Sequence, residues 1–317
     1  MEQKKRVVHL MGTVIDLQIQ HDSPDAVLDE TVNRLEIYER RFSANDASSE
    51  LMEINQNAGI RPVSVHPDLY ELIKIGKFHS CSPDSNLNIT IGPLVQTWRI
   101  GFEDAKVPEP QEIQELLKKI DPENIVLDDS EQSVFLKQTG MLIDLGALAK
   151  GYIADKIIAY LKEANVLSGL INLGGNLVTM GDAPTRADHN WRIGIQNPIL
   201  SRGNFVATLK VHDQSVVTSG IYERSLKSGG ETYHHILDAH TGYPIETDVV
   251  SLTIVSDQSV DGEIWTTRLF GKPVNEIIRT LETLPGIEGL VITKEGKLFF
   301  SKDLEKAVGY KVKNIYD

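Results

Sequence analysis

Residues 141–156 read MLIDLGALAKGYIADK, and this segment, the central stretch, combines a strand end, a tight turn and a helix start. Its first three residues are apolar and predict the end of a buried strand, which stops at Asp144. Gly146 and Ala147 are small, so the backbone can approach a ligand closely at this turn. Apolar residues then recur at helical spacing and predict a helix with one apolar face, formed by Ala149, Ile153, Ile157 and Leu161.

The same stretch places a carboxylate, Asp144, and an ammonium, Lys150, around the strand-to-helix turn. The first turn of a helix carries unpaired N–H groups and the positive end of the helix dipole, and both suit a phosphate. The alternative is an ordinary connection in which Asp144 and Lys150 are solvated. The stretch taken alone does not decide between the two interpretations.

Length and composition describe an ordinary globular chain without a basic surface. The 317 residues are enough for one large domain or two closely packed halves, and 41% of them are hydrophobic and 24% charged. The formal net charge of −13 argues against a general nucleic-acid surface, which would need clustered basic residues. Cys81 is the single cysteine, so an intrachain disulfide is excluded.

The sequence predicts neither an exported chain nor one that spans a membrane. The N-terminal residues have a basic start but only a short apolar run, which His9 and Asp16 interrupt, and no small-residue cleavage site follows. No run of about 20 apolar residues is present to cross a bilayer. We therefore expect a cytoplasmic protein without a membrane anchor.

Apolar and polar residues alternate at residues 15–20 and predict a half-buried strand. Further strands are predicted at residues 125–127, 134–136, 169–178, 191–195, 205–212, 215–218, 249–255, 290–293 and 297–300. The segments at 125–127 and 134–136 are expected to pair with each other. Two hairpins are also predicted, one from 205–212 and 215–218 and one from 290–293 and 297–300. The strand at 169–178 contains two glycines, where a ligand or another backbone comes close.

Helical spacing predicts four more helices, which begin near Pro24, Pro67, Ile113 and Val274, while Gly92-Pro93 is expected to form a turn. Strands and helices are mixed without regular βαβ alternation, so the predicted fold class is α+β, as a single unit over residues 1–317. No G-x-G-x-x-G or G-x-x-x-x-G-K-[ST] motif occurs, so ordinary dinucleotide-binding and P-loop folds have no support.

The segment DLGALAKGY of the central stretch resembles the D-x-G-G-I-A-K-G-Y signature of the ApbE-type flavin transferases, which move FMN from FAD onto protein. Other segments resemble that family in the right order along nearly the whole chain: MGT (11–13), FS (42–43), SEL (49–51), IN (54–55), NITIGPLVQTW (88–98), NLGGN (172–176), WRIGIQNP (191–198), TSG (218–220), HILDAHTGYP (235–244) and WTT (265–267). The resemblance implies one ApbE-like, T-fold-related globular unit of mixed sheets and helices, with the FAD site in a central cleft.

The resemblance also implies a reaction. A Thr or Ser hydroxyl of an acceptor flavoprotein attacks the phosphorus on the FMN side of FAD, a phosphoester forms and AMP leaves. Phosphoryl transfer of this kind needs a divalent cation, positive groups for the phosphates and a proton acceptor. FAD is then the substrate and Mg²⁺ the implied cation. The chain shows no good copy of the family's acceptor motif, so we expect the acceptor to be a separate protein.

Carried over from the family, the metal ligands fall on Glu263, Thr267 and the backbone carbonyl of Ala147. The i, i+4 spacing puts Glu263 and Thr267 on one face of a helix. The family usually has Asp at the first position, where this chain has Glu, and Asp261 is a nearby competitor. The alternative for Glu263 is an exposed residue at a helix start that stabilises the helix dipole.

His235 matches the histidine that precedes I-I-D in the family, and an imidazole can accept a proton near neutral pH. His234 is the substitute if the register differs, and His240 is expected to be a surface loop residue. The flavin contacts implied by the resemblance are Met11, Asn45, Leu87, Asn88, Asp144, Lys150 and Ile236. Lys150 can meet a phosphate as a point charge.

Two of these flavin contacts depart from the family pattern. Asn88 stands where the family commonly has Asp, and it keeps the capacity to form hydrogen bonds. Asn45 stands where many members have Tyr or Phe. An aromatic side chain at that position can stack on a ring of FAD, whereas asparagine cannot.

Three functions therefore remain open. The first is a Mg²⁺-dependent FAD:protein FMN transferase. The second is a Mg²⁺-dependent FAD pyrophosphatase that gives FMN and AMP, and Asn45 is the residue that raises it. The third is a non-catalytic flavin-binding protein, which would follow if Glu263 broke the metal site. Incubation with FAD and Mg²⁺, with and without an acceptor peptide, separates all three.

Overall fold

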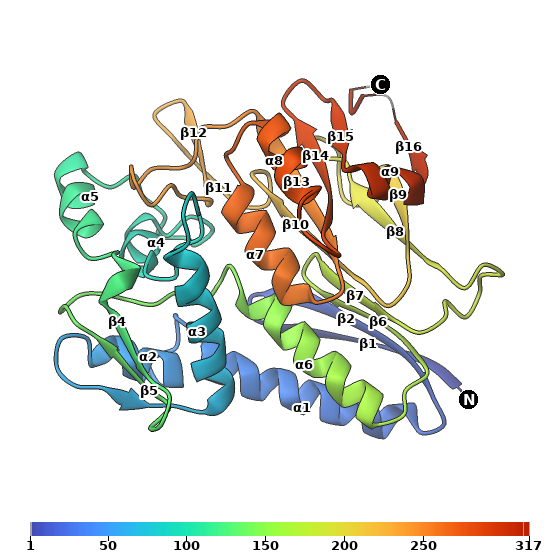
Figure 1. The fold of residues 1–317 in the computed structure, drawn as a ribbon, viewed down its shortest axis with the longest axis horizontal. Coiled ribbons are helices and arrows are strands. Elements are labelled where there is room, and N and C mark those ends of the chain that lie inside the picture. Colours follow the sequence, from blue (N-terminus) through green and yellow to red (C-terminus); the bar gives the residue numbers. More distant parts are fainter. Residues whose placement is uncertain (1, 313, 317) are drawn as a thin grey trace.

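A long antiparallel sheet forms the centre of the computed structural model, which describes residues 2–312 and 314–316 (Figure 1). Met1, Lys313 and Asp317, which the predicted unit 1–317 includes, lie outside the described residues. The strands of this sheet hydrogen-bond in the order β1 (Glu2–Leu10), β2 (Thr13–His21), β6 (Ser168–Leu173), β7 (Asn176–Met180), β10 (Ser215–Gly220), β13 (Val249–Ser256), β14 (Glu288–Thr293) and β15 (Leu298–Phe300). Each neighbouring pair is antiparallel.

Three helices lie along one face of the long sheet: α1 (Pro24–Phe42), α6 (Ala149–Glu163) and α7 (Ser259–Leu269) (Figure 1). α1 has a proline in its first turn and buries Leu28 and Leu35 completely, as its predicted apolar stripe requires. α6 buries Ile153 of the central stretch together with Ile157 and Leu161 beyond it, and this confirms the helix expected there. Burial of apolar area stabilises by roughly 25 cal/mol per Å², so these stripes attach the helices to the sheet.

A three-stranded sheet covers the opposite face of the long sheet. Its strands lie in the order β16 (Val308–Lys311), β9 (Phe205–Val211) and β8 (Trp191–Gln196). Ile193 of β8 shares one apolar cluster with Val216 of β10. The next residue, Val217, lies against α7, because a Cβ at Gly262 would come within 2.6 Å of it. β10 is therefore buried on both faces, between a sheet and a helix.

Of the remaining elements, α8 (Val274–Leu281) and α9 (Lys302–Ala307) pack against β14 of the long sheet, and most of the others extend beyond it (Figure 1). Two small sheets are formed by β11 (Ser225–Ser228) with β12 (Glu231–His234), and by β3 (Val63–Ser64), β5 (Ser133–Leu136) and β4 (Ile125–Asp128). The other helices are α2 (Glu50–Gln56), α3 (Pro67–Ser80), α4 (Gly92–Trp98), α5 (Pro110–Leu117) and a 3₁₀ turn at Pro122–Asn124. The indole N–H of Trp98 donates to the carbonyl of Gly242 at 2.8 Å, which ties α4 to the loop after β12.

The α+β class and most predicted elements are confirmed. β4 pairs with β5 and β14 pairs with β15, as the sequence predicts. The prediction of one strand at 169–178 is wrong, because Gly174 and Gly175 both have positive φ and turn the chain between β6 and β7. The prediction of a hairpin from 205–212 and 215–218 is also wrong. Both strands exist, but β9 and β10 belong to different sheets.

Two predicted local details also differ. Gly92-Pro93 does not form an isolated turn but begins α4, since proline is favourable in the first turn of a helix. The predicted strand end at residues 141–143 reduces to one isolated bridge between Leu142 and Ile91. A Cβ at Gly92 would lie 2.6 Å from the Leu142 carbonyl oxygen, so glycine is what allows these two backbones to meet.

Candidate active site

The backbone of the central stretch is held from two sides before α6 begins. Asn55 bonds the main chain of Ile143 twice, accepting from its N–H at 2.7 Å and donating to its carbonyl at 3.0 Å. The N–H of Asp144 donates to the carbonyl of Ile89 at 2.8 Å. The turn that precedes α6 therefore has a fixed path, although it belongs to no extended strand.

Asp144 is hydrogen-bonded within the turn before α6, whereas Lys150 is partly exposed to solvent. Asp144 is half-buried, its Oδ1 accepts from the N–H of Gly146 at 2.7 Å, and burial raises the pKa of its carboxyl. The side chain of Lys150, in the first turn of α6, is 34% exposed. The ammonium of Lys150 is thus accessible to an anionic ligand, whereas one carboxylate oxygen of Asp144 closes the turn.

Close contact between α6 and α7 brings a second charged residue to this turn. A Cβ at Gly151 would lie 2.6 Å from the carbonyl oxygen of Ser259 and 2.7 Å from Cγ of Glu263. Only glycine fits between the two helices without displacing one of them. The start of α6 is therefore packed directly against the helical turn that carries Glu263.

Glu263 is a buried carboxylate with three polar partners, Asn176, Lys150 and the backbone N–H of Gly151. It is 5% exposed, and its Oε1 accepts from Nδ2 of Asn176 at 3.0 Å and lies 4.0 Å from Nζ of Lys150. Burial raises the pKa of its carboxyl, and Lys150 and the Asn176 amide oppose that shift. The alternative of an exposed, helix-capping Glu263 is therefore wrong.

The competitor Asp261 lies in a different environment. It is half-buried, and burial raises the pKa of its carboxyl. The negative charge of Asp257 raises this pKa as well, by a smaller amount. Its charge also raises the pKa of Asp155, so it faces other carboxylates and not the ammonium of Lys150. The geometry favours Glu263 over Asp261 as the carboxylate beside the central stretch.

The oxygen atoms near Glu263 fit a hard divalent cation. Thr267 follows Glu263 by one turn of α7 and is half-exposed, and Ala147 is exposed in the turn before α6. Across residues 2–312 and 314–316, no three His, Cys, Asp or Glu side chains gather to hold a metal ion. A cation here would rely on one carboxylate with hydroxyl and carbonyl oxygens, a ligand set that Mg²⁺ accepts while it keeps several waters.

His235 follows β12 and lies within electrostatic reach of Lys150. Its Nδ1 lies 3.3 Å from the carbonyl oxygen of Arg224, so Nδ1 carries the proton and Nε2 carries the lone pair. Burial, together with the positive charges of Arg224 and Lys150, lowers the pKa of His235 to about 4, although the hydrogen bond to the Arg224 carbonyl opposes the shift. His235 is therefore neutral at pH 7, with a basic nitrogen that faces away from its backbone partner.

The other two candidate histidines are engaged differently. His234 uses both ring nitrogens, since Nε2 donates to the carbonyl of Ile245 at 3.0 Å and Nδ1 accepts from the N–H of Ile236 at 3.3 Å. His240 is exposed in the turn after β12, as expected of a surface loop residue. Both ring nitrogens of His234 are therefore engaged and His240 lies on the surface, whereas Nε2 of His235 is available within reach of Lys150.

The predicted flavin contacts other than Asp144 and Lys150 are spread over several elements. Met11 is half-buried in the β1–β2 turn, and its N–H donates to Glu39 at 2.5 Å. Asn45 is exposed, and its side chain accepts from Gln96 of α4 at 3.3 Å. Ile236 is half-buried beside His235.

The last two predicted contacts, Leu87 and Asn88, face the protein. Leu87 is 1% exposed, and the hydroxyl of Ser85 accepts from its N–H at 3.2 Å and donates to its carbonyl at 3.4 Å. The amide of Asn88 bonds Thr90 and the carbonyl of Ile120, at 2.6 to 2.8 Å. The asparagine in place of the family's usual aspartate therefore serves the loop before α4 in this structure.

Comparison with known proteins connects this geometry to a family. The sequence pattern of the ApbE family matches residues 11–291, which is most of the chain. The chain belongs to the ApbE family. It is 40% identical over 293 residues to an FAD:protein FMN transferase of Klebsiella pneumoniae (strain 342), covering 92% of this chain and 90% of that protein. An FAD:protein FMN transferase of Treponema pallidum (strain Nichols) is 34% identical over 89% of this chain and 82% of its own length.

Solved structures agree with this family membership. The ApbE protein of Thermotoga maritima superposes with a TM-score of 0.87 at 26% identity, covering 96% of this chain and 99% of that one. The flavin transferase ApbE from Vibrio cholerae gives a TM-score of 0.83 at 23% identity, covering 96% and 99%. The second likeness is one of fold alone. The predicted ApbE-like fold is thereby confirmed.

Sequence reasoning missed several residues that shape the site of this ApbE-family chain. Asn176 belongs to the NLGGN segment but received no role, and Ser259 and Asp155 carried no separate signal. Asp155 of α6 accepts from the N–H groups of Ser259 and Val260 at 2.7 and 2.9 Å, which caps α7. Burial raises the pKa of Asp155 to about 6 against these two bonds.

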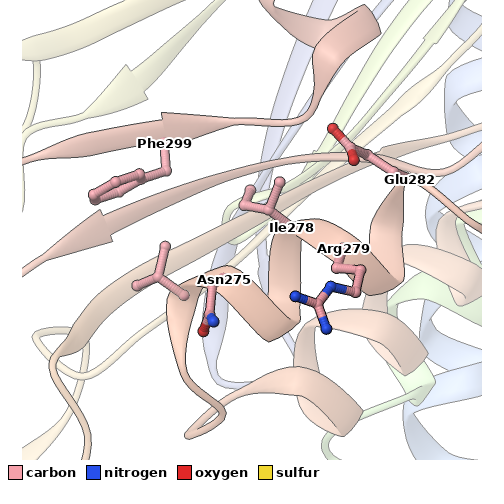
Figure 2. A pocket seen from close by; sticks show the side chains of 6 residues that line it. Asn275, Ile278, Arg279, Glu282 and Phe299 are labelled. Atoms are coloured by element: carbon pink, nitrogen blue, oxygen red, sulfur yellow. The ribbon is translucent and has the colours of Figure 1, made fainter.

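A surface hollow of about 500 Å³ lies apart from these residues, at α8 and β15 (Figure 2). It is lined by Val274, Asn275, Ile278, Arg279, Glu282 and Phe299. None of the predicted site residues lines it. Within the described part of the chain, no helix has the length and apolar character needed to cross a bilayer.

Proposed function

We propose that this chain is a Mg²⁺-dependent FAD:protein FMN transferase that attaches FMN through a phosphoester to Thr or Ser of an acceptor flavoprotein. The observation that carries the proposal is the pairing of Lys150 with Glu263 at the start of α6, with His235 within electrostatic reach of Lys150. An ammonium for phosphate, a carboxylate for a cation and a neutral imidazole are the three parts that phosphoryl transfer requires. The relatives named FAD:protein FMN transferase support the same reaction.

The proposed step conserves atoms and charge. The acceptor oxygen bonds to the phosphorus on the FMN side, and the bond from that phosphorus to the bridging oxygen breaks. AMP leaves with the bridging oxygen and its electron pair. His235 Nε2 takes the hydroxyl proton, which its neutral form permits, while Lys150 neutralises phosphate charge.

Glu263, Thr267 and the carbonyl of Ala147 would hold Mg²⁺, and Asp144, Met11 and Ile236 would contact the flavin nucleotide. When bound, Mg²⁺ supplies charge neutralisation on the phosphates. Gly151 packs the start of α6 against the start of α7. Because the proposed ligands lie at these two helix starts, this contact would hold their oxygen atoms in one arrangement. We place FAD in the central cleft predicted from the sequence, beside Lys150, with Asn45, Leu87 and Asn88 at its borders.

Further parts of the proposal concern the setting of the enzyme. We keep the whole chain, residues 1–317, as a single flavin transferase domain. The acceptor is a separate protein, nucleic acid is not a partner, and the cellular location is cytoplasmic. Glu263 is buried beside Lys150, so its longer side chain does not remove the carboxylate from the site. We therefore do not retain the non-catalytic alternative.

One experiment tests the reaction itself. The protein is incubated with FAD, Mg²⁺ and an acceptor flavoprotein, and AMP release is compared with covalent flavin on the acceptor. Covalent flavin is expected to account for most of the AMP released, with a smaller excess of AMP from hydrolysis of FAD. AMP release with no acceptor ever labelled would identify a pyrophosphatase instead, and neither product would contradict both enzymatic functions.

FAD and ADP are expected to raise the melting temperature of the protein. A ligand that binds only the folded state stabilises by about 2.7 kcal/mol at 100 times Kd, which corresponds to a rise of roughly 5 °C. Differential scanning fluorimetry measures the shift. Riboflavin, which lacks phosphates for Lys150, serves as the control and should give a smaller shift. An unchanged melting temperature at saturating FAD would contradict the binding site.

Asn45→Tyr is expected to lower the ratio of FAD hydrolysis to FMN transfer. Asn45 is exposed, so the wild-type pocket has no aromatic cover at this position and water competes with the acceptor hydroxyl. A bound acceptor still holds its hydroxyl at high effective concentration, so transfer dominates when an acceptor is present. Hydrolysis is measured as the AMP released in excess of labelled acceptor, and transfer is measured as the covalent flavin on the acceptor. The ratio divides the first amount by the second. Ala47→Tyr, which adds the same ring two residues along the exposed loop, should leave the ratio unchanged; an equal ratio for wild type and Asn45→Tyr would remove Asn45 from the argument.

A further inference from the structure

Asn176 makes two directed hydrogen bonds inside the protein. It is the first residue of β7, directly after the Gly174-Gly175 turn, and is 2% exposed. Its Oδ1 accepts from the hydroxyl of Ser259 at 2.6 Å, and its Nδ2 donates to Oε1 of Glu263 at 3.0 Å. A carboxylate can only accept, so the bond to Glu263 fixes which end of the amide is nitrogen.

The partner that orients Asn176 is itself fixed. Ser259 is fully buried at the start of α7, and its N–H donates to Asp155 Oδ1 at 2.7 Å. Asp155 lies on α6, one turn after Lys150 and Gly151. Asn176 therefore connects β7, through Ser259 and Asp155, to the two helices that meet at the candidate cation site.

We propose that Asn176 is a positioning residue that turns Glu263 toward the cation. The inference rests on the proposed function, in which Glu263 is a ligand of Mg²⁺. The Asn176 amide holds Oε1, the oxygen that also lies 4.0 Å from Lys150, and the backbone N–H of Gly151 is a further hydrogen-bond partner of the carboxylate. By holding Oε1, the amide fixes the orientation in which the carboxylate meets a cation.

The chemistry of an amide suits this role. Asn176 is neutral, so it fixes the orientation of Glu263 without cancelling the negative charge that attracts the ion. A lysine or arginine in its place would form an ion pair and compete with the cation. Partners that orient a metal ligand in this way typically change metal affinity 10- to 100-fold when they are removed.

The test measures cation binding without any substrate. Mn²⁺ is titrated into the protein, and the electron paramagnetic resonance signal of free Mn²⁺ gives Kd. Asn176→Ala is expected to raise Kd about 10- to 100-fold. Thr179→Val is the matched control: Thr179 is 2% exposed on the same strand, and its hydroxyl donates to the Gln214 carbonyl at 3.0 Å, away from Glu263. It should leave Kd unchanged while losing a comparable hydrogen bond.

A second variant covers the case in which Asn176→Ala does not fold. Ser259→Ala removes the hydroxyl that orients the amide but leaves the amide in place, so a smaller rise in Kd is expected. Kd values within twofold of wild type for the folded variants would overturn the inference. Glu263→Ala separates this failure from that of the proposed function. If Glu263→Ala abolishes Mn²⁺ binding and Asn176→Ala leaves Kd unchanged, only the positioning role of Asn176 is wrong. If Glu263→Ala binds Mn²⁺ as tightly as wild type, or if wild type binds no Mn²⁺, Glu263 is not a ligand and both the inference and the proposed function fail.

Discussion

Glu263→Ala and Thr267→Ala are expected to reduce the rate of FMN transfer far more than they reduce folding stability. Loss of a carboxylate that holds the cation removes several kcal/mol of charge stabilisation in the transition state, and about 4 kcal/mol corresponds to roughly a 10³-fold lower rate. As the proposed second ligand, Thr267 would contribute a neutral oxygen, so its loss should have a smaller effect than the loss of Glu263. The measurement is initial AMP release at limiting Mg²⁺.

The isosteric variant Glu263→Gln separates chemistry from folding. Glu263 is 5% exposed, and a buried ionised carboxylate lowers the free energy of unfolding unless it is fully paired. Glutamine removes that charge, so its melting temperature without metal should equal or exceed that of wild type while turnover collapses. A parallel loss of both would indicate a structural role for Glu263.

Asp261→Ala is the matched control for the ligand assignment. Asp261 lies two residues earlier on α7 and faces the charges of Asp257 and Asp155 instead of Lys150. We expect its rate to stay within a few-fold of wild type. Wild-type rates for both Glu263→Ala and Thr267→Ala at limiting Mg²⁺, together with a large loss for Asp261→Ala, would move the carboxylate ligand to Asp261.

Local periodicity predicted the elements of this fold better than their partners. The apolar spacing of Ile153, Ile157 and Leu161 is a property of one helix, so it gave α6 correctly. The two strands β9 and β10 were also recognised, but alternation says only that a strand has a buried face. β10 pairs with β7 and β13, which are distant in sequence, and the short Asp213 turn does not close a hairpin. Sheet membership depends on long-range packing that a local pattern does not contain.

In the candidate active site, too, local relations could be predicted from the sequence and long-range contacts could not. The i, i+4 spacing correctly placed Glu263 and Thr267 on one helix, because that relation is local. The hydrogen bond from Asn176 to Glu263 spans 87 residues of sequence, and the contact of Gly151 with α7 joins residues that lie even farther apart. No spacing rule reaches that far. The roles assigned to single residues, such as His235 and Asn45, came from the family resemblance and stay predictions until they are measured.

His235→Gln is expected to lower kcat for FMN transfer about 10²- to 10⁴-fold, the range that a positioned general base contributes. Glutamine keeps a polar side chain near the Arg224 carbonyl but offers no basic nitrogen to the acceptor hydroxyl. His234→Gln is the control. Both ring nitrogens of His234 bond the backbone, so it should lose about 1 kcal/mol of stability per bond and retain its rate.

The pH dependence gives an independent measure of the same residue. Burial and the nearby positive charges lower the pKa of His235 to about 4, so the free enzyme holds the imidazole neutral above about pH 5. A base acts only when it is unprotonated, so kcat/KM should be flat through pH 6.5 and fall as pH drops through about 4. The usual histidine value of about 6.5 would place that fall more than two units higher.

Bound FAD should shift this dependence in a defined direction. Its phosphates bring negative charge toward Lys150, one of the charges that lower the His235 pKa, and negative charge favours the protonated imidazole. The acid limb of kcat, which reports the substrate complex, should therefore lie at higher pH than the limb of kcat/KM. An acid limb of kcat/KM near 6.5 that survives in His235→Gln would show that another group accepts the proton. Loss of the limb in His235→Gln, with its position near 4 in wild type, would assign the base to His235.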